Sequence, residues 1–479
     1  MFNRTVTPAP SFWLGLAALA AALLLDPPAG WSIEAWRTAG VMVLMAVWWA
    51  TEALPLPVTA LAPLALLPWL GSTTAAELAD GYGNPILFLI LGGFLLALAM
   101  ERCRLHQRIA YSIVARAGGQ PRRLVLGLMT ATAMVNMWVS NTSTTLMMLP
   151  VALSVVATVA PDPGAGDREQ RNFATAAVLG IAYGATIGGL ATLVGTPTNA
   201  LVVGFMQENF GQTISFARWL VFGLPAVALL LPLAWLVLVR VAFPFRLEPQ
   251  DGAGAAVRQA LAELGPMTPA EKRVLAIFLL AASAWIFGPL LRSLPGLGGL
   301  SDTSVALLAG GALFLVRAGG AGRDTLLSGA DLRRIPWDVL LLFGGGLALA
   351  AAIQDSGLAA IIGRSLAGLS ALPLLLLMAA VVTLMIFWTE LNSNVASAAT
   401  FLPVLGAIAA GTHYPALTLV APAAMAASCA FMLPVGTPPN AIVFGTGRVA
   451  IRDMIRAGWY LNLAGIVVIT AVGRVVLPD

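Results

Sequence analysis

The sequence predicts an all-α membrane protein that crosses the bilayer many times, and three observations lead to that fold class. The first is composition: 59% of the 479 residues are hydrophobic, only 10% are charged, and the mean hydropathy is +0.88. The second is the length of the apolar segments, many of which approach the roughly 20 residues that an α-helix needs to span a bilayer. The third is a pair of short polar strings that recur in the same order in both halves of the chain.

Long apolar runs mark the expected membrane helices, because charged residues are rare inside them and gather between them. The first run lacks a small-residue cleavage site and is followed directly by further runs, so we expect a membrane helix there rather than a signal peptide. About 11 spans are expected, near 11–26, 36–52, 56–71, 85–101, 172–206, 216–240, 273–293, 303–317, 336–354, 417–446 and 456–477.

Two further apolar segments, 121–158 and 371–410, are too long for one membrane helix, and a polar string interrupts each near its middle. Each is expected to form a re-entrant hairpin that enters the membrane and returns to the same side. The spans at 172–206 and 417–446 are also interrupted, each by a Gly-Thr-Pro string, and are expected to be broken helices.

The basic residues support this topology. With the N-terminus in the cytoplasm, 21 of the 26 Lys and Arg residues fall in inner loops, as the positive-inside rule requires. The net charge of +4 is therefore attributed to orientation, not to a nucleic-acid surface. The first hairpin then enters from the cytoplasm and the second from outside, which makes the two halves inverted repeats. The five basic residues left outside are Arg37, Arg218, Arg292, Arg364 and Arg474.

The same pattern divides the chain into parts. Leu91-Gly92-Gly93 precedes the first hairpin much as Phe343-Gly344-Gly345 precedes the second, and small residues there would allow close helix packing. The expected parts are N-terminal scaffold helices (1–84), a first inverted repeat (85–245), a polar cytoplasmic linker (246–272), further scaffold helices (273–335) and a second inverted repeat (336–479).

The duplicated strings carry the chemistry. The first half has Ser140-Asn141-Thr142 and then Gly195-Thr196-Pro197-Thr198-Asn199-Ala200; the second has Ser393-Asn394-Val395 and then Gly436-Thr437-Pro438-Pro439-Asn440-Ala441. A break in a membrane helix exposes backbone groups that lipid cannot satisfy, so these strings are expected to be buried in protein or to line a watery cavity.

A returning hairpin helix offers free N–H groups and a partial positive charge, and hydroxyl and amide donors beside it favour a carboxylate or sulfate. Pro197 and Pro438 lack an N–H, so they free carbonyl groups that can coordinate a hard cation such as sodium. The strings therefore indicate one anion site flanked by two cation sites.

A single copy of each string would have a simpler interpretation. A single Ser-Asn-Thr triplet commonly serves helix packing, and a single Gly-x-Pro break is commonly a kink. The ordered duplication favours a transport site instead. Glu390, an acid inside the second hairpin, is either a coupling residue or the acceptor of a structural hydrogen bond. The basic run 101–123 is expected to be an interfacial amphipathic helix. A membrane enzyme would need converging acids, histidines or metal ligands, whereas these strings are neutral.

Together with Thr51-Glu52-Ala53-Leu54-Pro55-Leu56-Pro57-Val58-Thr59-Ala60, the four strings resemble the divalent anion/sodium symporter family over nearly the whole chain. This resemblance implies a homodimeric carrier in a bacterial inner (cell) membrane that transports dicarboxylates, citrate or sulfate. It also implies coupling to sodium or exchange, and an elevator mechanism in which a domain holding both hairpins slides against a fixed scaffold.

The resemblance also implies roles for individual residues. Substrate contact is implied for Ser140, Asn141, Thr142, Ser393 and Asn394, with Thr196, Pro197, Thr437 and Pro438 in the adjoining loops. The first sodium position would involve Asn136, Ser140, Asn141 and Gly195, and the second Thr389, Asn392, Asn394 and Gly436. The main departure is Val395, which stands where the fuller motif has a threonine.

The sequence thus predicts a sodium-coupled importer of C4-dicarboxylates such as succinate, malate and fumarate. A sodium-independent dicarboxylate exchanger and a sodium-coupled citrate or sulfate transporter remain alternatives, and a membrane enzyme is a remote one.

Overall fold

The computed structural model describes residues 10–161, 168–249, 251–319, 324–366, 368, 371–412 and 414–477. Within these residues the chain is helical, and the only extended pairing is an isolated bridge between Arg317 and Thr325. The predicted all-α class is therefore confirmed.

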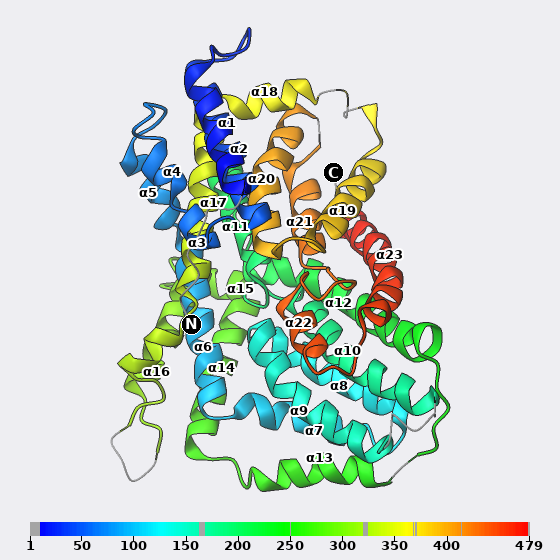
Figure 1. Cartoon of the computed structure of the whole chain (residues 1–479). Helices are drawn as coiled ribbons and strands as arrows, with labels where there is room; N and C mark the ends of the chain where they lie inside the picture. Colours follow the sequence, from blue (N-terminus) through cyan, green and yellow to red (C-terminus); the bar gives the residue numbers. More distant parts are fainter. Residues whose placement is uncertain are drawn as a thin grey trace.

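The helices follow one another along the whole chain (Figure 1). Their bounds are α1 (Pro10–Leu24), α2 (Ile33–Thr51), α3 (Leu56–Thr59), α4 (Ala62–Leu66), α5 (Ala75–Tyr82), α6 (Pro85–Arg102), α7 (Leu105–Ala115), α8 (Pro121–Asn136), α9 (Asn141–Val159), α10 (Arg168–Gly189), α11 (Pro197–Phe210), α12 (Phe216–Leu236), the π-helix η1 (Val237–Ala242), α13 (Asp251–Glu263), α14 (Pro269–Ile286), α15 (Gly288–Arg292), α16 (Asp302–Leu315), the 3-10 helix η2 (Gly329–Arg334), α17 (Trp337–Asp355), α18 (Leu358–Ser365), α19 (Leu374–Thr389), α20 (Asn394–Gly411), α21 (Ala416–Ala427), α22 (Pro438–Phe444) and α23 (Ile451–Val476).

Six helices of the described chain are long and apolar enough to cross a membrane, judged by length and composition. Two of them, α9 and α20, are the returning limbs of the two hairpins. Among the other predicted spans, α2 (19 residues) and α14 (18 residues) have comparable length but are not among the six, and the rest are shorter or broken helices. The six candidate spans are Ala75–Arg102, Asn141–Val159, Phe216–Ala242, Trp337–Asp355, Asn394–Gly411 and Ile451–Val476.

The prediction of one continuous span at 56–71 is wrong. The chain there forms two short helices, α3 and α4, each with a proline in its first turn. Proline is tolerated in the first turn of a helix but removes a hydrogen bond from the interior. Pro57 and Pro63 therefore suit two helix starts, whereas a single helix over this segment would hold Pro63 in its middle.

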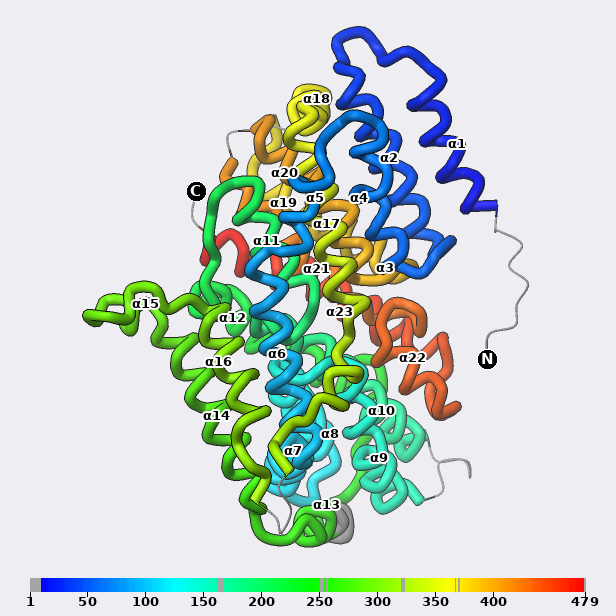
Figure 2. Tube along the Cα trace, turned by 90° about the vertical axis from the view of Figure 1, so that its left-hand side faces the viewer, coloured from blue at the N-terminus to red at the C-terminus, as the bar shows by residue number. Residues whose placement is uncertain are grey.

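Both predicted hairpins are present. The first consists of α8 and α9 and the second of α19 and α20, and each pair is joined by four residues, the last of which is the serine that begins a polar string. Figures 1 and 2 place the first hairpin in the lower half of the molecule and the second in the upper half. In both views α7 and α13 lie at the lower end and α18 lies at the upper end. The hairpins thus lie toward opposite ends, as inverted repeats require.

The two broken helices are also present, and they pack crosswise. The first is α10 followed by α11, and the second is α21 followed by α22. The downstream half α11 packs on α20 and α21 of the second repeat, while α22 packs on α9 and α10 of the first. Each half of the sequence thus supplies a short helix that covers the hairpin region of the other half.

The paired glycines before the hairpins allow close packing, as predicted. A Cβ added to Gly93 would fall 2.7 Å from a side-chain carbon of Val194, and one on Gly92 would overlap the backbone of Ala306. In the second repeat, a Cβ on Gly344 would overlap Tyr82 and one on Gly345 would overlap the carbonyl of Ala60. A larger residue at these positions would force α6 or α17 away from its neighbours.

The polar linker at 246–272 contains a helix, α13, which packs on α7 and α9. An ion pair fixes its end: Arg108 Nε donates to Glu271 Oε1 at 2.7 Å, and Arg108 Nη1 donates to the Gly265 carbonyl at 2.9 Å. Glu271 is buried, with 3% of its surface exposed. Hydrogen bonding thus connects α7 of the first repeat to the start of α14.

Candidate functional site

The tip of the first hairpin brings Asn136, the last residue of α8, against Asn141, the first residue of α9. Asn136 Nδ2 donates to Asn141 Oδ1 at 2.6 Å. A Cβ added to Gly189, at the end of α10, would lie 3.0 Å from Asn136 Nδ2, 3.1 Å from the Gly195 carbonyl oxygen and 3.3 Å from Asn141 Oδ1. Asn136 is fully buried, and its Oδ1 finds no hydrogen-bond donor among the described residues. Asn136, Asn141 and Gly195 therefore converge.

One asparagine holds the break between α10 and α11 together. Asn199 Nδ2 donates to the carbonyl oxygens of Gly189 at 3.0 Å and Thr192 at 2.8 Å, ten and seven residues earlier in the chain. Thr192 Oγ1 in turn donates to the carbonyl of Met137 at the hairpin tip. Carbonyl groups that the break removes from the helix are thus satisfied by side chains, and the break is fixed against the tip.

The second hairpin tip repeats this arrangement with different residues. Thr389, the last residue of α19, donates through Oγ1 to the Ala427 carbonyl at 2.7 Å. With its amide nitrogen turned toward its acceptors, Asn394 lies 3.0 Å from the Gly436 carbonyl oxygen, 3.1 Å from that of Ala427 and 2.8 Å from Thr389 Oγ1. Thr389, Asn394 and Gly436 therefore converge as well.

The break between α21 and α22 has its own asparagine. Asn440 Nδ2 donates to the carbonyl oxygens of Ala430 at 3.1 Å and Leu433 at 3.0 Å, which again lie ten and seven residues earlier. Asn199 and Asn440 belong to the strings found in the sequence, but no role was assigned to them there. Their common position four residues after Gly195 and Gly436 was the signal that could have identified this function.

The two breaks contact each other directly. Thr198 Oγ1 lies 2.6 Å from Ser428 Oγ, and Thr196 Oγ1 lies 3.4 Å from the same atom. Tyr183 of α10 is fully buried and donates through its hydroxyl to the Phe431 carbonyl at 2.9 Å. Ser428 and Tyr183 were not predicted as site residues. Through these contacts, each hairpin tip is joined to its own break, and the breaks are joined to each other.

Glu390 joins the second tip to the second break. Its Oε1 accepts from the backbone N–H of Phe431 at 2.7 Å and from Asn462 Nδ2 of α23 at 2.8 Å. Its Oε2 accepts from the backbone N–H groups of Met432 and Leu433, each at 3.0 Å. The oxygens of this buried carboxyl group are thus fully supplied with hydrogen-bond donors. Of the two interpretations of Glu390, the geometry favours the structural one.

Other predicted residues of the first half lie at the edges of the site. Ser140 is exposed and caps α9 by accepting from the Ser143 N–H at 3.3 Å. Thr142 is also exposed. Pro197 opens α11, so the break precedes this proline. Pro438 occupies the same first position in α22, where a missing N–H is no disadvantage.

In the second half, Asn392 does not join the converging set, because its Nδ2 donates back to the Trp388 carbonyl at 3.2 Å. Ser393 is the N-cap residue of α20, but its side chain makes no capping hydrogen bond, and Val395 is half-buried. Thr437 is buried and accepts from the Asn440 N–H at 3.3 Å, which caps α22.

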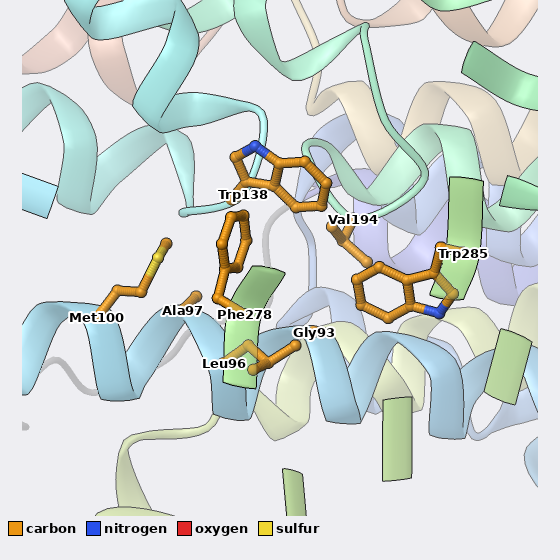
Figure 3. Close-up of a pocket in the computed structure, with 8 residues that line it drawn as sticks. All are labelled: Gly93, Leu96, Ala97, Met100, Trp138, Val194, Phe278 and Trp285. Carbon is orange, nitrogen blue, oxygen red and sulfur yellow. The ribbon is translucent and has the colours of Figure 1, made fainter. Parts of the chain in front are cut away.

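An aromatic cluster supports the first tip from the side (Figure 3). The Trp138 ring lies 4.8 Å from Phe278 in an edge-to-face arrangement and 6.3 Å from Trp285, both on α14. Gly93 of α6 and Val194 of the first break line the same region, and the space between these side chains is too small for a water molecule. The surface between the tip and α6 and α14 is therefore apolar and closely packed.

Known proteins resemble this chain over nearly its whole length. The family described as the sodium:sulfate symporter transmembrane region matches residues 10–477. A protein named sodium-dependent dicarboxylate transporter SdcS, from Staphylococcus saprophyticus, is 40% identical over 470 residues, which is 97% of this chain and 90% of the relative. The protein of the same name from Staphylococcus aureus is 39% identical over 450 residues, covering 92% and 86%.

A solved structure supports the fold. The crystal structure of the Alcanivorax borkumensis YdaH transporter aligns with a TM-score of 0.59 and 17% identity, covering 90% of this chain and 97% of that one. At this identity the likeness concerns the fold alone. The family match and the Staphylococcus relatives concern the sequence itself, and the matched range 10–477 spans the duplicated strings that form the site. The chain therefore belongs to the sodium:sulfate symporter family, the divalent anion/sodium symporters that its motifs resemble, and it is a transporter and not an enzyme.

Proposed function

We propose that this protein imports C4-dicarboxylates such as succinate, malate and fumarate, coupled to the inward movement of sodium. The observation that carries the proposal is the convergence of uncharged amide, hydroxyl and carbonyl groups at both hairpin tips: Asn136, Asn141 and the Gly195 carbonyl at the first, and Thr389, Asn394 and the Gly436 carbonyl at the second. Neutral oxygens at helix breaks are the usual ligands of sodium in transporters. The relatives named sodium-dependent dicarboxylate transporters support both the ion and the substrate class.

Sodium would bind in two positions. The first combines Asn136, Asn141 and Gly195, where the buried Oδ1 of Asn136 finds no donor among the described residues and a cation would satisfy it. The second combines Thr389, Asn394 and Gly436. Ser140 and Asn392, whose side chains are engaged within their own hairpins, would contribute through backbone oxygens or after a change of rotamer.

The substrate would lie between these positions. The helices α9 and α20 each begin at a tip, so their free N–H groups and partial positive charge favour a carboxylate. Side-chain donors come from Ser140, Asn141, Thr142, Ser393 and Asn394, with Val395 beside them and Thr196, Pro197, Thr437 and Pro438 in the adjoining loops. Two bound sodium ions balance the charge of a dianion, and any further sodium would make transport electrogenic.

We further propose that transport proceeds by an elevator movement. The hairpins and broken helices would slide together against scaffold helices drawn from 1–84 and 273–335. The apolar contact of Trp138 and Val194 with Phe278 and Trp285 of α14 supports this division, because a surface of this kind holds no hydrogen bond of its own. The hydrogen bond from Asn84 Nδ2 to Glu208 Oε2 of α11, at 2.9 Å, would have to break during sliding. The proposal includes two further statements. The protein forms a homodimer through the scaffold helices, and its N-terminus lies in the cytoplasm. Mass photometry and terminal-tag accessibility test these last two statements.

Uptake of radiolabelled succinate into proteoliposomes tests the function. Accumulation into empty vesicles that requires an inward sodium gradient is the expected result. Uptake only into vesicles preloaded with succinate, regardless of sodium, would replace the proposal with exchange. No uptake of succinate, together with uptake of citrate or sulfate, would change the substrate class instead.

Single substitutions at the two tips test the site. Asn141→Ala and Asn394→Ala are each expected to abolish succinate uptake, because each removes an amide that takes part in both sodium and substrate binding. Asn209→Ala is a matched control, since Asn209 lies at the end of α11 and, among the described residues, donates only to the Phe205 carbonyl of its own helix. Full uptake by either tip variant would remove that residue from the site.

A further inference from the structure

A polar cavity of about 350 Å³ lies far from the hairpin tips. It is formed where the first turns of α10 and α23 meet the residues that follow η1. Arg171 in its wall precedes Gly189 on the same helix by 18 residues, a distance of about 27 Å. The cavity is therefore separate from the transport site. The residues of its wall that matter here are Arg171, Asn172, Phe243, Arg448, Arg452 and Asp453.

The cavity carries an excess of positive charge. Arg171, Arg448 and Arg452 are exposed, and their guanidinium groups form no ion pair with the residues that the structure describes. The one acid in the wall, Asp453, is engaged as a helix cap, because its Oδ2 accepts from the Ala450 N–H at 3.2 Å. Asn172 donates to the Pro244 carbonyl at 2.7 Å. Three unpaired guanidinium groups in a concave site favour a phosphate-like anion.

The cavity also lies at the end of two candidate membrane spans. One span, Phe216–Ala242, ends immediately before Phe243, and the other, Ile451–Val476, begins beside Arg452. The two spans pack against each other. Because both spans end at the cavity, the cavity lies at the boundary of the membrane, where polar headgroups meet hydrocarbon.

An apolar stripe continues from the cavity along α23. Ile451, Ile455 and Trp459 are 46%, 39% and 46% exposed, and their spacing of four residues places them on one face of the helix. Val241 of η1, 47% exposed, comes just before the cavity. An exposed apolar face on a membrane helix contacts acyl chains, and here it begins at the arginines.

We propose that this cavity binds an anionic phospholipid, with the headgroup phosphate between Arg171, Arg448 and Arg452 and an acyl chain along Ile451, Ile455 and Trp459. Basic pockets between membrane helices bind acidic headgroups, and the proposed topology places this one in the cytoplasmic leaflet. A soluble phosphate would use the same arginines but gain nothing from the stripe. The combination of charged cavity and apolar stripe is what selects a lipid.

Native mass spectrometry of the full chain in detergent tests the proposal. The probe is phosphatidylglycerol, compared with phosphatidylcholine carrying the same acyl chains. Replacing Arg171, Arg448 and Arg452 together with glutamine is expected to weaken phosphatidylglycerol binding about 100-fold, at roughly fivefold for each arginine. The matched control replaces Arg123, Arg333 and Arg364, which are also exposed and lie elsewhere. Equal losses in both variants, or equal binding of the two lipids by the unmodified protein, would overturn the proposal.

A second pair of variants separates a lipid from soluble phosphate. Ile451→Thr with Ile455→Thr is expected to weaken phosphatidylglycerol binding, whereas Val467→Thr with Val475→Thr, exposed positions further along the same helix, is not. Inorganic phosphate is expected to compete poorly. If phosphate displaces the lipid fully and the stripe variant binds normally, the cavity is a soluble-anion site and the lipid proposal fails. An unchanged melting temperature in each variant establishes that the fold is intact.

Discussion

Val395 distinguishes the second tip from the first at the scale of single residues. It occupies the place that Thr142 holds in the first string, it is half-buried, and it has the shape of threonine without the hydroxyl. The proposed anion therefore meets one hydroxyl fewer on the side of the second tip.

Val395→Thr is expected to change the relative affinities for succinate, citrate and sulfate by about tenfold, because a hydrogen bond to a charged group contributes about 1.5–3 kcal/mol. Competition of each anion against radiolabelled succinate measures the change. Val404→Thr, a half-buried position on the same helix, is the control and should leave the order of preference as it was. An unchanged preference in Val395→Thr would indicate that this position does not touch the anion.

Glu390 makes a different kind of contribution. Because its two oxygens accept from three backbone N–H groups and from Asn462, Glu390→Gln would turn an N–H₂ group toward donors. We expect this variant to lose about 3 kcal/mol of stability and much of its uptake, while the number of sodium ions moved per substrate stays the same.

Thermal unfolding and a reversal-potential measurement of stoichiometry check both parts of the Glu390 prediction. Glu34→Gln, at an exposed position of α2, should change neither the thermal stability nor the sodium stoichiometry. A changed sodium stoichiometry in Glu390→Gln would instead make Glu390 a coupling residue.

Much of the candidate site could be predicted from residues alone, because the polar strings are repeated. The predicted residues form two clusters, one in each half of the chain. The first contains Asn136, Asn141 and Gly195, and the second contains Thr389, Asn394 and Gly436. The contacts of Ser428, Tyr183 and Asn462 could not be predicted. Each of these residues occurs once, and each acts across a long sequence separation that only the packing of α10, α21 and α23 determines.

At the scale of helices, the ion pair between Arg108 and Glu271 connects α7 to α14. Burial opposes the charged form of Glu271, but hydrogen bonds from Arg108 and Thr268 outweigh it and hold the pKa of this carboxyl below its ordinary value. A carboxyl with a lowered pKa in the folded state stabilises the fold above its unfolded pKa, and that stability is lost as the pH falls through the folded pKa.

Arg108→Gln is therefore expected to lose about 3 kcal/mol of stability near neutral pH, because it leaves a buried carboxylate unpaired. Arg108→Gln combined with Glu271→Gln should recover part of the loss. The unmodified protein should be more stable than Glu271→Gln, and this difference in stability should be complete above pH 4.5, the ordinary pKa of a glutamate carboxyl. The difference should shrink as the pH falls below that value. Melting temperatures in detergent across this pH range measure it; a difference that grows as the pH falls would contradict the assignment.

The helices were predictable to different degrees, for physical reasons. Hairpins and broken helices were found because polar strings interrupt apolar runs at a depth where lipid cannot satisfy the backbone. The segment 56–71 was mispredicted because hydropathy does not register the prolines that begin α3 and α4. The linker helix α13 was missed because its sequence is polar and its packing on α7 and α9 is tertiary.

At the scale of the whole molecule, sodium should stabilise the fold. Both proposed sodium positions join a hairpin tip to a break, and the breaks contact each other through Thr198 and Ser428. Sodium that binds only the folded state adds about 2.7 kcal/mol per site when its concentration is 100 times the dissociation constant. The melting temperature is therefore expected to rise when sodium replaces choline at constant ionic strength.

When sodium replaces choline, the melting temperature of Asn141→Ala should rise less than that of the unmodified protein. The melting temperature of Asn209→Ala should rise as much as that of the unmodified protein. The same melting temperature in sodium and choline for the unmodified protein would count against sodium binding. A rise that is equally large in Asn141→Ala would place the ion elsewhere.

The crosswise packing of α11 and α22 also has a consequence for biosynthesis. The helix α22, which covers α9 and α10, lies far downstream of them in the sequence. A nascent chain that has inserted only its first half therefore holds a hairpin without its cover, and the proposed first sodium position remains uncovered until α22 has been synthesised. Assembly of the transport site is thus completed late in translation. Ribosome stalling between the two halves would leave the first half inserted in the membrane without the helix that covers it.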